Sequence, residues 1–194
     1  MTFDYIPAGI ITCPSHSRNK GSTMIEFTLV GIPLIFILIS IFEISRGMWI
    51  YETVAYSVRE GARFAAVHGS DCGTAQANNV CSLTIGNIAE VISNHGAGIG
   101  LDSGTLNVTI KTGLPFTNLS TAPLYTTGPT LMKNLLSNST VFSNQAGTTP
   151  GNDVEVSATY PFQSALVMFW PGAKQVQRFS VVNFAASSRE RIEF

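Results

Sequence analysis

Cys72 and Cys81 are a pair of reactive side chains with suggestive spacing. They bracket a short stretch rich in glycine and asparagine, a composition typical of a surface loop. A disulfide between them suits an oxidising compartment, and two free thiols are the alternative. A zinc ion would need two more ligands, and the neighbouring His68 and His95 lack zinc-finger spacing. We therefore predict a disulfide between Cys72 and Cys81.

The remaining sequence contains no catalytic grouping that we can identify. Its three histidines show no ligand spacing, and it has neither a Gly-x-Ser-x-Gly elbow nor a phosphate-binding glycine loop. A net charge of −1 provides no excess of basic charge for nucleic acid. We expect no enzymatic activity, no metal, no cofactor, no small-molecule substrate and no nucleic-acid partner.

The apolar residues are concentrated near the N-terminus. Only 12% of the chain is charged, against about 25% in a typical soluble domain, and residues 27–42 carry no charge at all. As a helix, residues 24–45 are long enough to cross about 30 Å of hydrocarbon. Glu26 and Glu43 lie near its two edges, where each can reach the interface or a partner. A buried core helix is the alternative, but little of the later sequence looks able to cover one.

This apolar segment differs from a cleaved secretory signal. It is longer than the usual apolar region of about 7–15 residues, and no small-x-small cleavage site follows it. We therefore expect a retained single-pass anchor in a bacterial cytoplasmic membrane. The predicted disulfide favours a cytoplasmic N-terminus and a periplasmic or extracellular remainder.

A short motif stands directly before the apolar segment: Arg18-Asn-Lys-Gly-Ser-Thr-Met-Ile-Glu-Phe27. It resembles the processing site of type IV pilins and pseudopilins, which a prepilin peptidase cuts after a glycine. The resemblance implies a cut between Gly21 and Ser22, a cytoplasmic leader 1–21, and Glu26 as fifth residue of the mature chain. It also implies that Glu26 pairs with the new amino group on Ser22 of a neighbouring subunit.

Further residues resemble the TadE-type pseudopilins of the tight-adherence, or Flp pilus, system. The first portion, roughly 17–67, contains a Glu43…Arg46 pair and the run Arg-Glu-Gly-Ala-Arg-Phe-Ala-Ala-Val67, which includes Arg59, Glu60 and Arg63. The second portion, roughly 153–190, reads as Val/Ser/Thr-rich strands. The chain between these portions resembles no family that we can name.

We expect one helix over residues 22–67, partly in lipid and partly packed on a head. Beyond the membrane it carries a narrow face of mostly small residues at i, i+3, i+4 spacing. Pro33 should kink the helix, and Glu60 and Arg63 can pair at i, i+3. A close helix–sheet contact would explain Gly61, which otherwise weakens the helix.

Residues 68–194 are expected to form an α+β head with an antiparallel sheet of about three to four strands. A short helix begins at Leu83 and ends near Gly96. Strands are expected over Thr105–Lys111, Asp153–Tyr160 and Arg178–Ser187, and Pro161 should end the second of these. Residues 114–152 read as a long loop with a short helix near 130–137. The apolar run 166–170 is either core or an interaction surface.

The sequence favours a membrane-anchored, TadE-like minor pseudopilin over two alternatives. Its expected partners are the membrane, a prepilin peptidase, and other pilin or pseudopilin subunits. One alternative is an uncleaved single-pass protein whose periplasmic head binds a partner or ligand. The other is a pseudopilin of a type II-like secretion machine, which would use the same cleavage but a different filament.

Overall fold

The computed structural model describes most of the chain: residues 20–68, 83–97, 101, 103–115, 122–164 and 181–193. Several predictions lie outside these residues. They concern most of the leader, the Cys72–Cys81 disulfide and the apolar run 166–170. The chain divides into two compact units, Met1–Ile39 and Ser40–Phe194, which are described separately.

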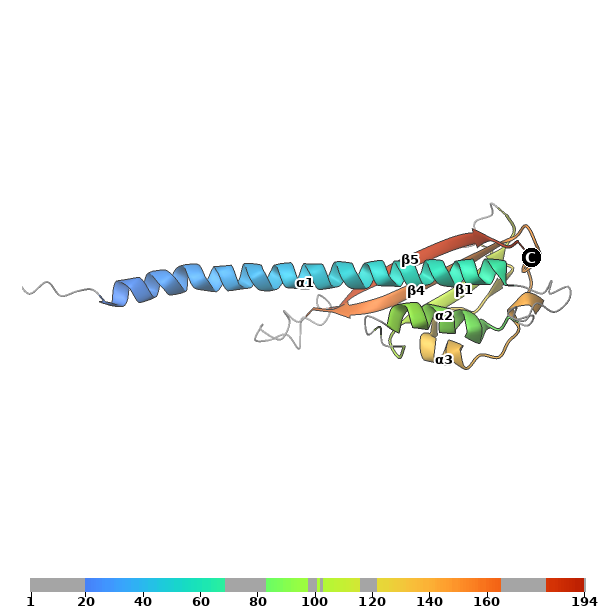
Figure 1. The fold of residues 1–194 in the computed structure, drawn as a ribbon, viewed down its shortest axis with the longest axis horizontal. Coiled ribbons are helices and arrows are strands. Elements are labelled where there is room, and N and C mark those ends of the chain that lie inside the picture. Colours follow the sequence, from blue (N-terminus) through green and yellow to red (C-terminus); the bar gives the residue numbers. More distant parts are fainter. Residues whose placement is uncertain are drawn as a thin grey trace, which may run out of the picture. The chain divides into compact units, whose positions relative to one another are not determined.

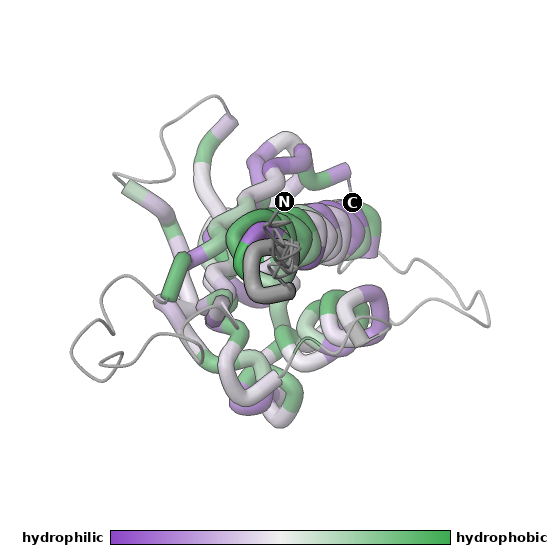
Figure 2. The backbone as a smooth tube through the Cα atoms, turned by 90° about the vertical axis from the view of Figure 1, so that its left-hand side faces the viewer, coloured by the Kyte–Doolittle hydropathy of each residue, from purple (hydrophilic) through white to green (hydrophobic). Residues whose placement is uncertain are grey.

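The N-terminal helix α1 spans Lys20–Val67 and is 48 residues long. It confirms the single helix predicted for residues 22–67 and continues through Pro33 without interruption. Its first part is strongly apolar, with an 18-residue window of mean hydropathy 2.4 that has none of its residues buried. Figure 2 shows hydrophobic residues over much of this helix. By length and composition this part can cross a membrane, and its exposure argues against the core-helix alternative.

The second unit is an α+β head whose described residues form a five-stranded antiparallel sheet (Figure 1). The strand order is β2-β1-β4-β5, and β3 pairs with the other end of β1. The strands are β1 (Asn107–Gly113), β2 (Tyr125–Thr126), β3 (Thr130–Leu131), β4 (Asp153–Gln163) and β5 (Val181–Arg191). The two short strands β2 and β3 lie within the predicted loop 114–152, which explains why the sheet exceeds the expected three to four strands.

Strand β4 is longer than predicted, because Pro161 does not end it. The strand runs through Pro161, which stands opposite Asn183 of β5, and ends at Gln163. Strand β1 pairs with β4 only as far as Thr159, so beyond that residue β4 pairs with β5 alone among the described strands. The end of β4 is therefore an edge segment, where proline is tolerated because one side of the strand makes no ladder bonds.

The described part of the head also contains two α-helices, α2 (Ile85–Ala97) and α3 (Met132–Leu136), and a 3-10 turn η1 (Phe142–Asn144). A polar cap defines the start of α2, because the Thr84 hydroxyl accepts a 3.2 Å hydrogen bond from the Asn87 backbone N–H. The Thr84 backbone N–H in turn donates to the Asn87 side-chain oxygen at 3.1 Å. This reciprocal arrangement satisfies N–H groups that a helix start leaves free.

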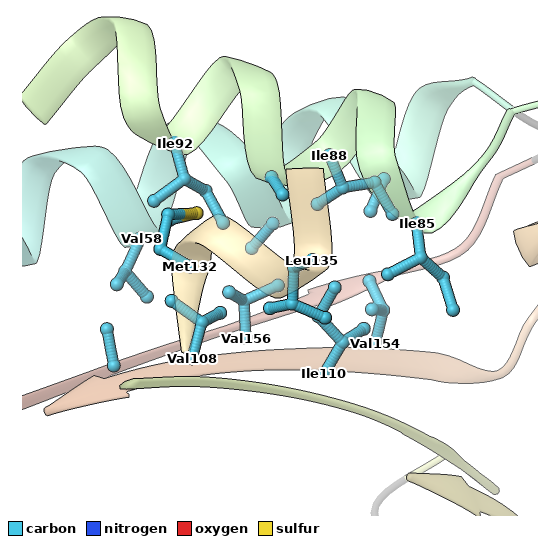
Figure 3. Close-up of a cluster of buried hydrophobic side chains, with 14 of the residues drawn as sticks. Val58, Ile85, Ile88, Ile92, Val108, Ile110, Met132, Leu135, Val154 and Val156 are labelled. Atoms are coloured by element: carbon cyan, nitrogen blue, oxygen red, sulfur yellow. The ribbon is translucent and has the colours of Figure 1, made fainter. Parts of the chain in front are cut away.

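The core of the head lies between the sheet and the helices (Figure 3). Alternate residues of β1 and β4 are fully buried, while residues between them are partly exposed. The buried apolar set from the strands meets residues from all three helices. It includes Val58, Ile85, Ile88, Ile92, Val108, Ile110, Met132, Leu135, Val154 and Val156.

The small-residue face of α1 enters this core, but one predicted contact is different. Val54, Val58, Ala62 and Ala65 are buried, as packing of the small face predicts. A Cβ added to Gly61 would lie 2.4 Å from Cγ1 of Ile92, which belongs to α2. The close approach that requires glycine is therefore helix to helix, and the predicted helix–sheet contact at Gly61 is wrong.

Candidate functional site

The predicted processing residues lie at the start of α1. The backbone of Gly21 and Ser22 is helical and belongs to the first turn, because α1 begins at Lys20. The helix therefore begins two residues before the predicted start at residue 22. The backbone N–H groups of a first turn have no acceptor within their own helix. Glu26 lies slightly further along the helix and is exposed.

A charged and aromatic cluster joins α1 to the end of β4. Arg46 Nη1 lies 3.8 Å from Glu43 Oε1 and donates a 3.5 Å hydrogen bond to the Gln163 carbonyl. The Arg46 guanidinium carbon also lies 5.2 Å from the centroid of the Phe162 ring. The cluster thus combines an ion pair, a hydrogen bond and a cation–π contact. The predicted Glu43…Arg46 pair is present, and its arginine reaches across to the sheet.

Aromatic rings continue this contact between α1 and the sheet. The ring centroids of Phe162 and Phe184, on neighbouring strands, are 5.3 Å apart. Tyr51 of α1 approaches Phe184 edge to face, with centroids 6.0 Å apart. A Cβ added at Gly47 would lie 3.5 Å from the Phe184 ring, an ordinary contact distance. Arg46 and Tyr51 of α1 thus contact residues near the end of β4 and the start of β5.

The second charged group on α1 lies several turns further on. Arg63 Nη1 is 3.2 Å from Glu60 Oε1, so the structure contains the pair that the i, i+3 spacing predicts. Both side chains are partly exposed to solvent, and such a pair contributes little to stability. Arg59 is also exposed. Arg59, Glu60 and Arg63 therefore lie at the surface of the head, and they are not part of the Glu43–Arg46 cluster.

The two described histidines are engaged by their own helices. His68 Nδ1 lies 3.0 Å from the Phe64 carbonyl oxygen, and His95 Nδ1 lies 2.8 Å from the Val91 carbonyl oxygen. Within the residues that the structure describes, no three His, Cys, Asp or Glu side chains gather as metal ligands.

An exposed aromatic row on α1 was missed by the sequence reasoning. Phe42, Trp49 and Tyr56 follow one another at seven-residue intervals, and all three are exposed. Seven residues are close to two helical turns, so the three side chains lie in one row along the helix. Tyr56 stands edge to face with His95 of α2, with ring centroids 5.6 Å apart. The regular spacing in the sequence is the signal that would have revealed this row.

Comparison with known families agrees with the TadE resemblance of the N-terminal helix. Residues 21–63 match the family described as TadE-like protein. The N-terminal segment is TadE-like. The match begins at Gly21 and covers most of α1, which confirms the resemblance predicted for that part of the chain. The resemblance suggested for residues 153–190 lies outside the match and stays a prediction.

The match over residues 21–63 suggests a general role. The TadE-like family points to involvement in assembly of Tad or Flp pili. A long apolar helix near the N-terminus fits a single-pass membrane protein of such a system. Association with a membrane and with pilin subunits is consistent with both findings. No curated protein and no solved structure matches the chain.

Proposed function

We propose that this chain is a membrane-anchored minor pseudopilin of a tight-adherence, or Flp, pilus, cleaved by a prepilin peptidase between Gly21 and Ser22. The observation that carries the proposal is the TadE-like match over residues 21–63, which begins at the proposed cleavage site. The apolar part of α1 supports it, because a pseudopilin needs a helix that can reside in the bilayer before assembly.

The proposed mechanism uses charge to set the position of one subunit beside another. Removal of residues 1–21 creates a positively charged amino group on Ser22. The Glu26 carboxylate of a neighbouring copy or related subunit then meets this amino group at the edge of the apolar segment. A charge in an apolar environment is costly, and the cost falls when an opposite charge and its hydrogen bonds are available. The pair therefore favours one alignment of neighbouring subunits along the helix axis.

Replacing Gly21 by alanine is expected to prevent cleavage. The peptidase recognises a residue without a side chain in the proposed reaction, so an added methyl group should leave the chain at its full 20.8 kDa. The measurement is the intact mass of the protein purified from native membranes, before and after reduction, because this mass shows at which residue the chain begins. If the proposed Cys72–Cys81 disulfide is present, reduction will increase the measured mass by that of two hydrogen atoms.

Gly31→Ala is the matched control for this experiment. Gly31 lies in the same helix, and an added Cβ there would meet only Phe27, at 3.9 Å, among the described atoms. This variant should be cleaved like the unmodified chain. A native protein that begins at Met1 would overturn the pseudopilin proposal, and an uncleaved single-pass protein with a binding head would replace it.

Glu26→Gln is expected to separate assembly from cleavage. The amide keeps the size of the side chain but removes the charge that the proposed pairing needs. We expect normal cleavage, together with loss of most of the association between a tagged copy and other pilus subunits in native membranes. Glu52→Gln, which removes an exposed carboxylate further along α1, should retain that association. Equal association of the two variants would contradict the charge-pairing mechanism.

A further inference from the structure

The exposed side chains of α1 change character along the helix. As far as Ile44 they are almost entirely aliphatic or phenylalanine. Next come Met48 and the amphipathic aromatics Trp49, Tyr51 and Tyr56, which are also exposed. Arg46 and Glu52 are exposed among these aromatic residues, Arg59 and Arg63 are exposed beyond them, and Glu60 is partly exposed. The purely apolar stretch is thus followed by aromatic side chains with polar groups, and charged side chains begin where these aromatic residues begin.

The aromatic row shows this gradient within one line of side chains. Phe42 is 73% exposed, Trp49 is 65% exposed and Tyr56 is 50% exposed. Phe42 has no polar atom, Trp49 has an indole N–H, and Tyr56 has a hydroxyl. Polarity therefore increases along the row with distance from the apolar segment. A core-facing row would not need this order, and these side chains do not face the core.

Grooves lie on both sides of the Trp49 side chain. One, of about 620 Å³, contains Trp49 and Tyr56 together with His95. The other, of about 430 Å³, contains Phe42 and Trp49 together with Leu101 and Tyr160. Trp49 therefore stands as a ridge between two recesses in the head. The two grooves leave space for acyl chains and lipid headgroups on either side of the Trp49 ring.

We propose that the row Phe42–Trp49–Tyr56 seats the head in the bilayer interface, with Trp49 at the level of the lipid headgroups. The inference rests on the proposed membrane anchor. Trp49 follows the predicted end of the span at residue 45 by four residues, or about 6 Å of helix. Tryptophan and tyrosine favour this zone because their rings are apolar and their N–H or O–H groups reach water. The ionic side chains that follow lie where water begins.

A second copy of the chain is the other candidate occupant of this surface, and the observations favour lipid. Two copies of the row in contact would oppose bulky rings, whereas close helix pairs in membranes use small residues. The row also follows directly on the exposed apolar positions of α1, the part of the helix that is proposed to lie in lipid. Its polarity gradient follows the helix axis, as the composition of a bilayer does.

The test is a series of full-length chains with one tryptophan each, reconstituted in phosphatidylcholine vesicles. The chain has two tryptophans, Trp49 and Trp170, so Trp170→Phe leaves Trp49 as the reporter. Adding Trp49→Phe to this variant allows the reporter to be moved by Phe42→Trp, Tyr56→Trp or Arg63→Trp. Each variant is measured with lipids brominated at a shallow or a deep acyl position, and with the aqueous quencher acrylamide.

We expect quenching by the brominated lipids to decrease as the single tryptophan is moved from position 42 to 49, 56 and 63. Quenching by acrylamide should increase in the same order. Trp49 should lose more fluorescence to the shallow label than to the deep one. Strong lipid quenching of a tryptophan at position 42, with no lipid quenching of Trp49, would overturn the proposal that Trp49 lies at the headgroups. The proposed membrane anchor would still stand. Protection of Trp49 from both lipid and acrylamide, dependent on protein density, would overturn it in favour of a second copy. Absence of lipid quenching even at 42 would mean that the anchor itself has failed.

Discussion

Val58→Asp is expected to unfold the head, the largest effect of any single change considered for this protein. Val58 is 1% exposed, and it points toward Met132 and Ile92 above the sheet (Figure 3). The substitution removes buried apolar area worth about 1.5–3 kcal/mol and introduces a carboxylate into an apolar site. An unpaired buried charge costs several kcal/mol more, and the total approaches the whole stability of a typical domain, about 5–15 kcal/mol.

The control is the neighbouring substitution Arg59→Asp. Arg59 is the next residue of the same helix and is exposed, so the new carboxylate stays in water and should cost less than about 1 kcal/mol. The measurement is hydrogen exchange of β1 and β4 in the detergent-solubilised full chain. Because burial raises the pKa of a carboxyl, the loss for Val58→Asp should be smaller near about pH 4 than near about pH 7. Equal protection of the two variants would contradict the packing of α1 on the sheet.

Gly61→Ala is expected to destabilise the head, although alanine is the better helix former. On propensity alone the change would stabilise the helix by about 1 kcal/mol. The added Cβ, however, would lie 2.4 Å from Cγ1 and 2.8 Å from Cδ1 of Ile92, a side chain that is fully buried. Cγ1 is close to the backbone of α2, so the two helices must separate. Overpacking of this kind costs about 1–3 kcal/mol, and we expect a net loss in the free energy of unfolding.

Gly47→Ala makes the same chemical change in the same helix without the clash. Its added Cβ would lie 3.5 Å from the Phe184 ring, so this variant should be as stable as the unmodified head or more stable. Ile92→Ala removes both atoms that obstruct the new methyl group at position 61. The cost of Gly61→Ala should therefore be much smaller in the Ile92→Ala background, as a denaturant-based double-mutant cycle would show. Purely additive costs would contradict a direct contact between Gly61 and Ile92.

The elements that the sequence predicted well are those with local causes. The helix over residues 22–67 follows from an apolar segment and a small-residue face at helical spacing, and α1 spans Lys20–Val67. The short helix α2 follows from the polar cap at Thr84 and the apolar spacing after it. The alternation in β1 and β4 predicted strands because every second residue is apolar. The Glu60–Arg63 pair likewise depends only on one turn of helix.

The predictions that failed or fell short depended on distant parts of the chain. Pro161 stops a strand only if both edges are paired, and the length of β1 relative to β4 decides that. Strands β2 and β3 pair with β1, and each is only two residues long, which is too short for an alternating pattern to show in the sequence. The partner of Gly61 belongs to α2, which no periodicity within α1 can identify.

In the candidate site, too, some features follow from local sequence and others from contacts between distant segments. The sequence by itself predicted the membrane-length helix, the pilin-like motif at Gly21 and Glu26, and a TadE resemblance over roughly 17–67, because each depends on neighbouring residues in one helix. The family match over residues 21–63 confirms the TadE resemblance there. Only the tertiary structure decided which face of that helix is covered. The sheet and α2 bury the small residues, Arg46 reaches Phe162 across the fold, and Trp49 stays exposed between two grooves. These outcomes depend on contacts between segments more than 30 residues apart in sequence, which local patterns do not encode.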